Sequence, residues 1–200
     1  RYQLVTGVQT CALPILTVDE ALQELFLKIR ENLQIRRFVR MEGILVPYIH
    51  GGGKIGVMVR AESPAGAIPE ILAAAKDCAL QVAAMNPPYL KREDVPAAVL
   101  DEEKKIILAQ MAEDPKMANK PEQVKEKIAA GKVGKYYGEN CLLEQAFVKE
   151  NKETVQSYVD GVAKAAGTTI AITAFVRFER GEGIEKKADN FAEEIASMIK

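Results

Sequence analysis

The chain has 200 residues, of which 48% are apolar and 28% are charged, so it can bury one sizeable core or two small ones. The formal net charge is −1, and this balance argues against the large basic surface that neutralises a nucleic-acid backbone. Nucleic acid is therefore not an expected direct partner. No apolar run approaches the roughly 20 residues of a membrane-spanning helix, so no membrane partner is expected and the cytoplasm is the expected compartment.

Cysteine and histidine are too few and too dispersed to predict a metal site or a disulfide framework. The three cysteines, Cys11, Cys78 and Cys141, are widely spaced and form no Cys-x-x-Cys pair, and the chain has one histidine. Nothing in the sequence indicates a cofactor, and none is expected.

The first fifteen residues differ in character from the rest of the chain. Residues 5–15, Val-Thr-Gly-Val-Gln-Thr-Cys-Ala-Leu-Pro-Ile, resemble the in-frame translation of a common sequencing-library adapter. Residues 1–15 are therefore predicted to be a non-native, adapter-derived segment, with a genuine short strand or tail as the alternative. On the first interpretation the native protein begins further upstream and this chain is a fragment of it.

An amphipathic helix followed by a β-hairpin is predicted after residue 16. Thr17 and Glu20 form a capping box, and apolar residues recur at helical spacing, so a helix is expected over residues 17–33. Segments rich in Val, Ile and aromatic residues are then expected to be extended at 35–41, 44–49 and 54–61. The glycines that follow His50 permit a tight reversal, which favours an antiparallel hairpin from the last two segments.

Helices are predicted for the middle of the chain. A helix is expected from about Pro69 to Met85, and the sequence Asn-Pro-Pro at 86–88 ends it. Two further helices, at about 97–113 and 121–130, carry narrow apolar stripes and many charges, which predicts an antiparallel hairpin that projects from the body. Its charges are typical of a solvated face, and the hairpin is also a candidate surface for self-association into a homodimer.

The last third of the chain returns to mixed structure. Residues 136–149 are expected to be extended or mixed, 153–166 helical, 168–180 a strand and 185–199 a final helix. Together the elements predict an α/β (α+β) protein in which helices pack on a sheet.

Catalytic motifs are nearly absent from the sequence. The run from Gly51 to Gly56 lacks the spacing of a phosphate-binding loop, and the glycines at 181 and 183 lack the third glycine of a dinucleotide loop. His50 could act as a general base, but no serine or cysteine motif lies beside it and the chain has no second histidine. Cys141 is better explained as a small core residue than as a nucleophile. A binding protein, not an enzyme, is predicted.

Several motifs occur in one order across residues 16–200 and together resemble the bacterial elongation factor Ts family. The runs that carry the resemblance are Glu31–Arg37, Tyr48–Gly51, Ala84–Leu90, Arg92–Pro96, Cys141–Gln145 and Gly181–Ile184. The resemblance implies a core of antiparallel sheet with packed helices and an inserted antiparallel helical hairpin. It implies residues 16–42 as the remnant of an N-terminal subdomain, 43–93 and 138–183 as the C-terminal subdomain, 94–137 as the hairpin and 184–200 as a C-terminal helix.

The resemblance also implies a function. Members of the family bind the GTPase elongation factor Tu and promote GDP release as guanine-nucleotide exchange factors. The family's N-terminal module and its Thr-Asp-Phe-Val motif, which wedges into the magnesium and phosphate site of the GTPase, do not occur in this sequence. A fragment impaired in exchange is therefore expected.

Five positions match partner-facing positions of the family, namely Ile29, Arg30, His50, Phe147 and Val148. Arg30 departs from the glycine that is common there. Core packing is the alternative explanation for Ile29, Phe147 and Val148, and a strand-end histidine bonded to backbone is the alternative for His50. Two rival functions stay open: an RNA-binding protein that uses the lysine-rich hairpin, and a small-molecule enzyme that uses His50.

Overall fold

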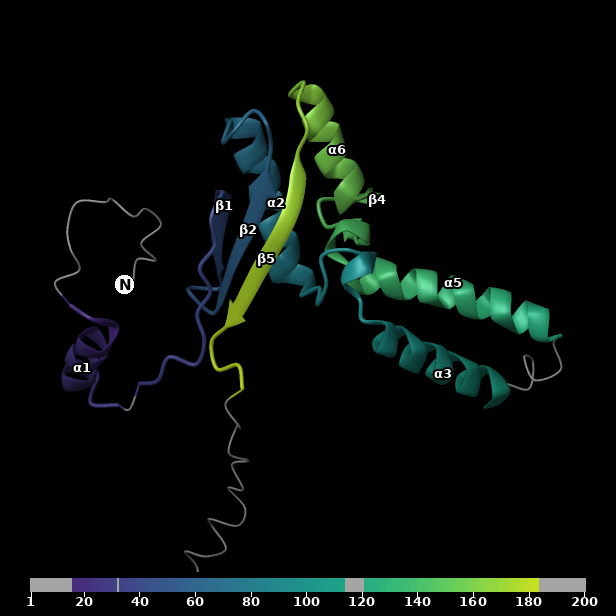
Figure 1. The fold of residues 1–200 in the computed structure, drawn as a ribbon, viewed down its shortest axis with the longest axis horizontal. Coiled ribbons are helices and arrows are strands. Elements are labelled where there is room, and N and C mark those ends of the chain that lie inside the picture. Colours follow the sequence, from purple (N-terminus) through teal and green to yellow (C-terminus); the bar gives the residue numbers. More distant parts are fainter. Residues whose placement is uncertain (1–15, 32, 114–120, 184–200) are drawn as a thin grey trace, which may run out of the picture.

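The computed structural model describes residues 16–31, 33–113 and 121–183, and its elements form a sheet-and-helix body with a projecting pair of helices (Figure 1). The helices are α1 (Val18–Ile29), α2 (Pro69–Met85), α3 (Ala97–Glu113), α5 (Glu122–Asn140) and α6 (Val155–Ala165), with short 3₁₀ turns η1 (Arg92–Asp94) and η2 (Leu142–Glu144). The strands are β1 (Ile44–His50), β2 (Ile55–Glu62), β3 (Ala146–Phe147), β4 (Glu150–Thr154) and β5 (Ala171–Glu179).

A three-stranded antiparallel sheet in the order β1-β2-β5 forms the centre of the body. The β1–β2 hairpin confirms the predicted reversal, because Gly51 and Gly52 have φ angles of 60° and 63°, which other residues rarely adopt. Strand β5 joins the sheet beside β2 although it lies more than a hundred residues later in the chain. The predicted antiparallel sheet is thus confirmed.

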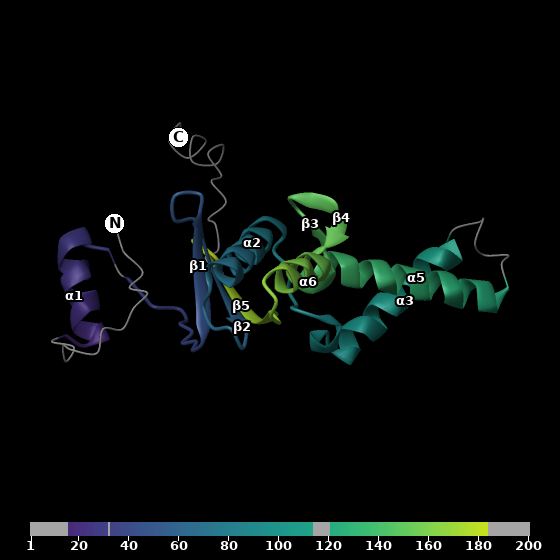
Figure 2. The ribbon, with the colours of Figure 1, turned by 90° about the horizontal axis from the view of Figure 1, so that it is seen from above.

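The main core lies between one face of this sheet and helices α2 and α6. Alternate residues of β2, Val57, Val59 and Ala61, point into it, as the period of a strand requires. Helix α2 faces them with small residues such as Ala75 and Ala79, which let the helix approach the sheet closely. Figure 2 shows α2 and α6 on the same side of the sheet.

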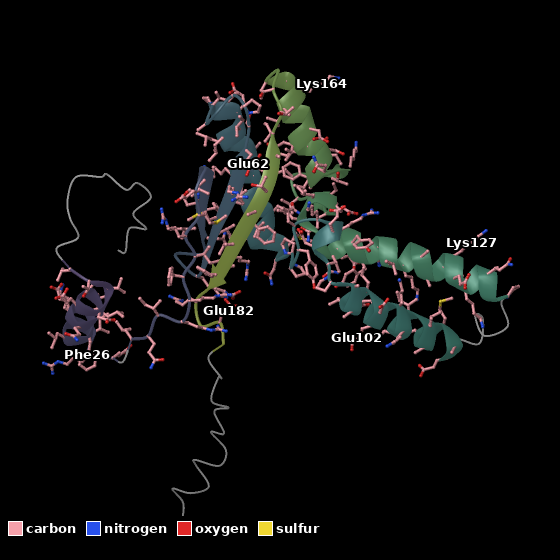
Figure 3. The ribbon with its side chains drawn as sticks, in the orientation of Figure 1. Phe26, Glu62, Glu102, Lys127, Lys164 and Glu182 are labelled. Carbon is pink, nitrogen blue, oxygen red and sulfur yellow. The ribbon has the colours of Figure 1, made fainter. Side chains whose placement is uncertain are left out.

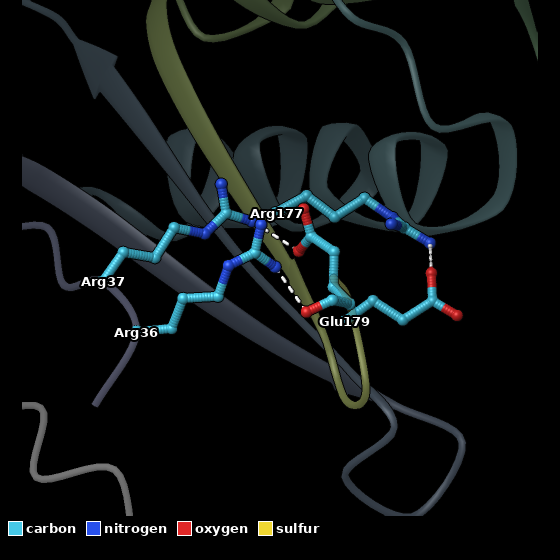
Figure 4. Close-up of polar contacts among 5 residues, drawn as sticks. Arg36, Arg37, Arg177 and Glu179 are labelled. Atoms are coloured by element: carbon cyan, nitrogen blue, oxygen red, sulfur yellow. Dashed lines mark hydrogen bonds and ion pairs between the residues drawn. The ribbon is translucent and has the colours of Figure 1, made fainter. Parts of the chain in front are cut away.

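The opposite face of the sheet carries no helix in the described part of the chain. The extended segment 33–41 runs past it, and an apolar groove is lined by Val39, Met41, Pro47, Ile49, Met58 and Phe178, among others. Two arginines fix this segment to the end of β5 (Figure 4): Arg36 donates to the backbone carbonyl of Glu182, and Arg37 pairs with the Glu182 carboxylate. The Arg37 guanidinium also lies 4.6 Å from the centre of the Phe178 ring.

The N-terminal helix is shorter than the sequence predicts. Its capping box is confirmed, since the Thr17 hydroxyl accepts from the Glu20 amide and the Glu20 carboxylate accepts from the Thr17 amide, which lowers the pKa of Glu20. The helix ends at Ile29, not residue 33, because Arg30 adopts a left-handed conformation with φ of 60°. The segment predicted to be extended at 35–41 is not a strand: none of the described strands pairs with it, so it has no ladder to join.

Helices α3 and α5 form the predicted hairpin, which projects away from the sheet. Figure 3 shows Glu102 and Lys127 on its outer surface. A small core of its own, Ile107, Met111 and Ala129, joins the two helices. The second helix was predicted to end at about residue 130, but α5 continues to Asn140. Residues 136–149 are mixed, with the end of α5, η2, β3 and a turn. Val133 extends the apolar stripe past Gly131, and this packing outweighs the low helix propensity of glycine.

The chain enters and leaves this hairpin side by side. The Tyr89 amide donates to the Asn140 carbonyl at 3.2 Å, and the Leu142 amide donates back to the Tyr89 carbonyl at 2.9 Å. The Arg92 guanidinium pairs with the Glu144 carboxylate and lies 4.9 Å from the centre of the Tyr137 ring. The contact between hairpin and body is therefore concentrated at this root.

Replacing residues 97–134 by a short Gly/Ser linker is expected to leave the body folded. The segments that flank the hairpin are hydrogen-bonded to each other at the root, and the hairpin core shares none of its buried residues with the main core. Urea unfolding followed by circular dichroism should remain a single cooperative transition. Loss of that transition would show that the hairpin is needed for folding of the body.

The predicted segments 1–15 and 184–200 lie outside the described residues. Within the described part of the chain, none of the helices combines the length and the apolar character needed to cross a membrane. The division into subdomains at 16–42, 43–93 with 138–183, and 94–137 stays a prediction.

Candidate functional site

Ile29 and Arg30 lie at the exposed end of α1. The structure describes the whole of this helix, and none of its residues is buried. Ile29 is 44% exposed. The Arg30 amide donates to the Phe26 carbonyl and closes the helix. A glycine would adopt the φ of 60° without strain, so arginine at this position costs about 1 kcal/mol of backbone energy while presenting a charge beside Ile29.

His50 lies at the end of β1, where the sheet meets the glycine turn. Its side chain is exposed, and the ring nitrogen Nδ1 lies 3.0 Å from the Tyr48 hydroxyl. The ring therefore has a side-chain partner on its own strand, two residues away and on the same side of the sheet. This contact orients the imidazole of an exposed residue.

Phe147 and Val148 lie at the tip of the β3–β4 hairpin but differ in exposure. Phe147 is 3% exposed, and its ring stacks on that of Tyr158 with a centroid distance of 4.2 Å. Val148 is 40% exposed at the turn. Of this pair, Val148 offers the side chain that a partner can reach, and Phe147 anchors the turn to α6.

The structure does not bring the five residues together into one pocket. The end of α1 lies on one side of the central sheet and the β3–β4 hairpin on the other (Figures 1 and 2). Among the described residues there is no group of three or more His, Cys, Asp or Glu side chains placed to hold a metal ion. The five positions can serve a macromolecule that covers several surfaces, but they do not form a single reactive centre.

Sequence reasoning missed a polar cluster behind the Val148 turn. Gln81 and Gln145, 0% and 1% exposed, are the buried polar side chains of the described core. Gln81 donates to the Gln145 side chain at 3.1 Å and accepts from the Val148 amide at 2.9 Å. A glutamine in an alanine-rich helix carries no pattern that marks it as buried, so only the structure reveals its role.

The comparison with known proteins decides the family. The family model described as Elongation factor TS matches residues 5–182. This chain belongs to the elongation factor Ts family. The match begins inside the segment predicted to be non-native, and the non-native origin of residues 1–15 stays a prediction.

Curated elongation factor Ts proteins cover almost the whole chain. Elongation factor Ts of Clostridium kluyveri is 47% identical over 187 residues, which are 92% of this chain and 59% of that protein. Relatives from Clostridium botulinum and Syntrophotalea carbinolica are 44% and 42% identical, each over 92% of this chain and 60% of their own length. The chain thus spans about three fifths of the length of the elongation factor Ts relatives it matches.

The two described cysteines of this elongation factor Ts chain have the properties of core residues. Cys78 and Cys141 are free thiols with 0% exposure, and burial raises their pKa to about 12 and about 11. Since the thiolate is the reactive species, both side chains are poor nucleophiles at neutral pH. The sequence interpretation of Cys141 as a small core residue agrees with this burial.

Both thiols are expected to react slowly with a disulfide reagent such as DTNB in the folded protein. At pH 8, raised pKa values lower the thiolate fraction by about 10²-fold or more, and denaturant should restore rapid reaction. The free energy of unfolding should also fall as the pH rises above 9.0, the ordinary pKa of a cysteine thiol. Above that pH the thiols ionise in the unfolded chain but stay protonated in the folded one. The measurement requires a Cys11→Ser background, so that only Cys78 and Cys141 report. Fast native reaction at one thiol would contradict its burial.

Proposed function

We propose that this chain binds elongation factor Tu in the cytoplasm and promotes the release of GDP from it, as a guanine-nucleotide exchange factor. The observation that carries the proposal is the 47% identity to a curated elongation factor Ts over 92% of the chain. The dispersed, exposed side chains of Ile29, Arg30, His50 and Val148 support it, since they suit a broad protein interface.

The proposed mechanism needs no covalent chemistry. An exchange factor binds the nucleotide-free GTPase more tightly than the nucleotide-bound form, and linkage requires that it weaken nucleotide binding by the same factor. Surfaces at the end of α1, at the end of β1 and at the β3–β4 turn would supply the differential contacts. Cofactors and catalytic groups have no part in this scheme.

A pull-down with purified elongation factor Tu tests the proposed partner. The chain should retain nucleotide-free elongation factor Tu, and added GDP should release it, because the two ligands oppose each other. Val148→Asp should weaken retention, since a charge at a desolvated contact is costly. Leu72→Asp is the matched control, because Leu72 is 37% exposed, close to the 40% of Val148, but lies near the start of α2. Failure of the unmodified chain to retain the GTPase would reject the proposal.

Self-association through the helical hairpin is a separate proposal. Ile106, Leu108 and Val124 expose large apolar side chains on α3 and α5, and a shallow groove between the helices is lined by Leu108, Ala129 and Val133. A homodimer would cover these side chains. Sedimentation velocity should show the chain as a dimer and the variant without residues 97–134 as a monomer. A monomeric unmodified chain at high concentration would reject the proposal.

A further inference from the structure

The turn that presents Val148 lacks the usual means of defining its own shape. Phe147 pairs with Glu150, so Val148 and Lys149 form a two-residue connection between β3 and β4. Such connections favour residues with positive φ, typically glycine or asparagine. Among the described non-glycine residues, only Arg30 and Asn86 have positive φ. Contacts from elsewhere in the fold must therefore hold this turn.

Gln81 supplies the first of these contacts from α2. Its side-chain amide uses both donors, to the Gln145 Oε1 and the Ala146 carbonyl, each at 3.1 Å. Its Oε1 accepts from the Val148 amide at 2.9 Å. The reverse orientation of the amide would place its N–H group against the Val148 N–H and its oxygen against the Ala146 carbonyl, so only one orientation satisfies all three contacts.

Gln145 continues this network to the root of the hairpin. Its side-chain nitrogen donates to the Glu139 carbonyl in α5 at 2.8 Å, while its oxygen accepts from Gln81. Its own carbonyl accepts from the Val155 amide at the start of α6 at 3.0 Å. The segment before the turn is thereby joined to α2, α5 and α6, and its polar groups are satisfied in the core.

Asp77 supplies a second contact from the same face of α2. It lies one helical turn before Gln81, at the i, i+4 spacing that places two side chains beside each other. Its carboxylate pairs with the Lys149 ammonium at 2.6 Å and accepts from the Tyr158 hydroxyl at 2.7 Å. Both residues of the turn, Val148 and Lys149, are thus held by one face of α2.

We propose that Asp77 and Gln81 are positioning residues that fix the β3–β4 turn in the conformation that binds the partner. The inference rests on the proposed function and assigns it two residues on α2, of which Gln81 has no exposed surface. They act through Val148 and Lys149, the two residues of the turn. A turn that is held in place before binding does not lose conformational freedom when the partner docks, and this raises the affinity.

Gln81→Met tests the role of Gln81, since methionine has nearly the same volume and removes the three hydrogen bonds. The Kd for nucleotide-free elongation factor Tu, measured by calorimetry, should rise about tenfold, and Asp77→Asn should raise it about threefold. In a Val148→Ala background, Gln81→Met should change the Kd by less than about twofold, because the contact that it positions is already gone. Equal loss in both backgrounds, or no loss in either, would overturn the proposal.

Val59→Ala is the matched control for a general loss of stability. Val59 is 0% exposed in β2 and belongs to the main core, but it makes none of the polar contacts to the turn. It should lower the free energy of unfolding and leave the Kd of the folded protein unchanged. An increase in Kd for Val59→Ala as large as that for Gln81→Met would indicate a merely structural effect and overturn the positioning role.

Hydrogen exchange provides a readout that does not depend on the partner. The Val148 amide should be protected in the unmodified chain and lose protection in Gln81→Met, because its acceptor is removed. Retained protection would overturn the inference even if binding changed. If the unmodified chain does not bind, the proposed function is rejected. If the unmodified chain and Gln81→Met bind equally well, only the positioning role is rejected. If Gln81→Met does not fold, Asp77→Asn, which alters a partly exposed contact, decides the question.

Discussion

Leu142→Ala is expected to lower the free energy of unfolding by about 2–5 kcal/mol, the range for deleting a fully buried leucine side chain. Leu142 is 0% exposed in η2 and belongs to the main core with residues of α2, α6 and the sheet. Its amide also donates to the Tyr89 carbonyl at the root of the helical hairpin. The cavity left by alanine therefore opens where four parts of the fold meet and cannot close without moving them.

Urea denaturation followed by circular dichroism measures this loss as a lower midpoint with an unchanged slope. Leu27→Ala is the matched control, because Leu27 is 72% exposed on α1 and its truncation should change the free energy of unfolding by less than about 0.5 kcal/mol. Similar losses for the two variants would contradict the central place of Leu142 in the core.

Elements with strong local signals were predicted almost completely from the sequence. Helix α2 has the predicted bounds, because Pro69 suits the first helical position and Asn86, in the left-handed conformation before two prolines, ends it. The β1–β2 hairpin follows from its glycine turn. In both cases the decisive interaction lies within a few residues, so a local pattern contains it.

Elements that depend on distant contacts were predicted less well. The end of α5 was placed too early, at about residue 130, because the packing of Val133 on the hairpin core is visible only in three dimensions. Segment 35–41 has the composition of a strand but finds no strand to pair with among the described residues. Composition indicates a tendency, and the available neighbours decide the outcome.

The candidate site was predicted only through the family resemblance. Ile29, Arg30, His50, Phe147 and Val148 share no local motif, and their assignment as partner contacts stays a proposal. The positioning residues Asp77 and Gln81 escaped sequence reasoning altogether, since a polar residue in an amphipathic helix is usually solvated. Their contacts with the Val148 turn span 67 to 72 positions of the sequence, and no periodicity reports such a distance.

Binding and exchange are expected to separate in this 200-residue chain. Its surfaces at α1, β1 and the β3–β4 turn are proposed to dock on elongation factor Tu. The sequence contains no Thr-Asp-Phe-Val run, which the family resemblance implies is a wedge into the magnesium and phosphate site of the GTPase. The chain should bind nucleotide-free elongation factor Tu measurably. At saturating concentration, the rate of GDP release with this chain should be at least about tenfold lower than with the full-length Clostridium kluyveri relative.

The physical reason is that a ligand shifts an equilibrium only by its differential affinity for the two states. Contacts that are equally strong with the nucleotide-bound and the nucleotide-free GTPase raise the affinity but do not speed GDP release. A wedge would contact chiefly the nucleotide-free GTPase and would therefore favour release. Stopped-flow fluorescence of a labelled GDP, with the full-length relative as control, measures the release rate directly, and calorimetry on the same samples measures binding. Release as fast as with the full-length relative would show that the docking surfaces alone distinguish the two states, and the proposed role of the wedge would then be wrong.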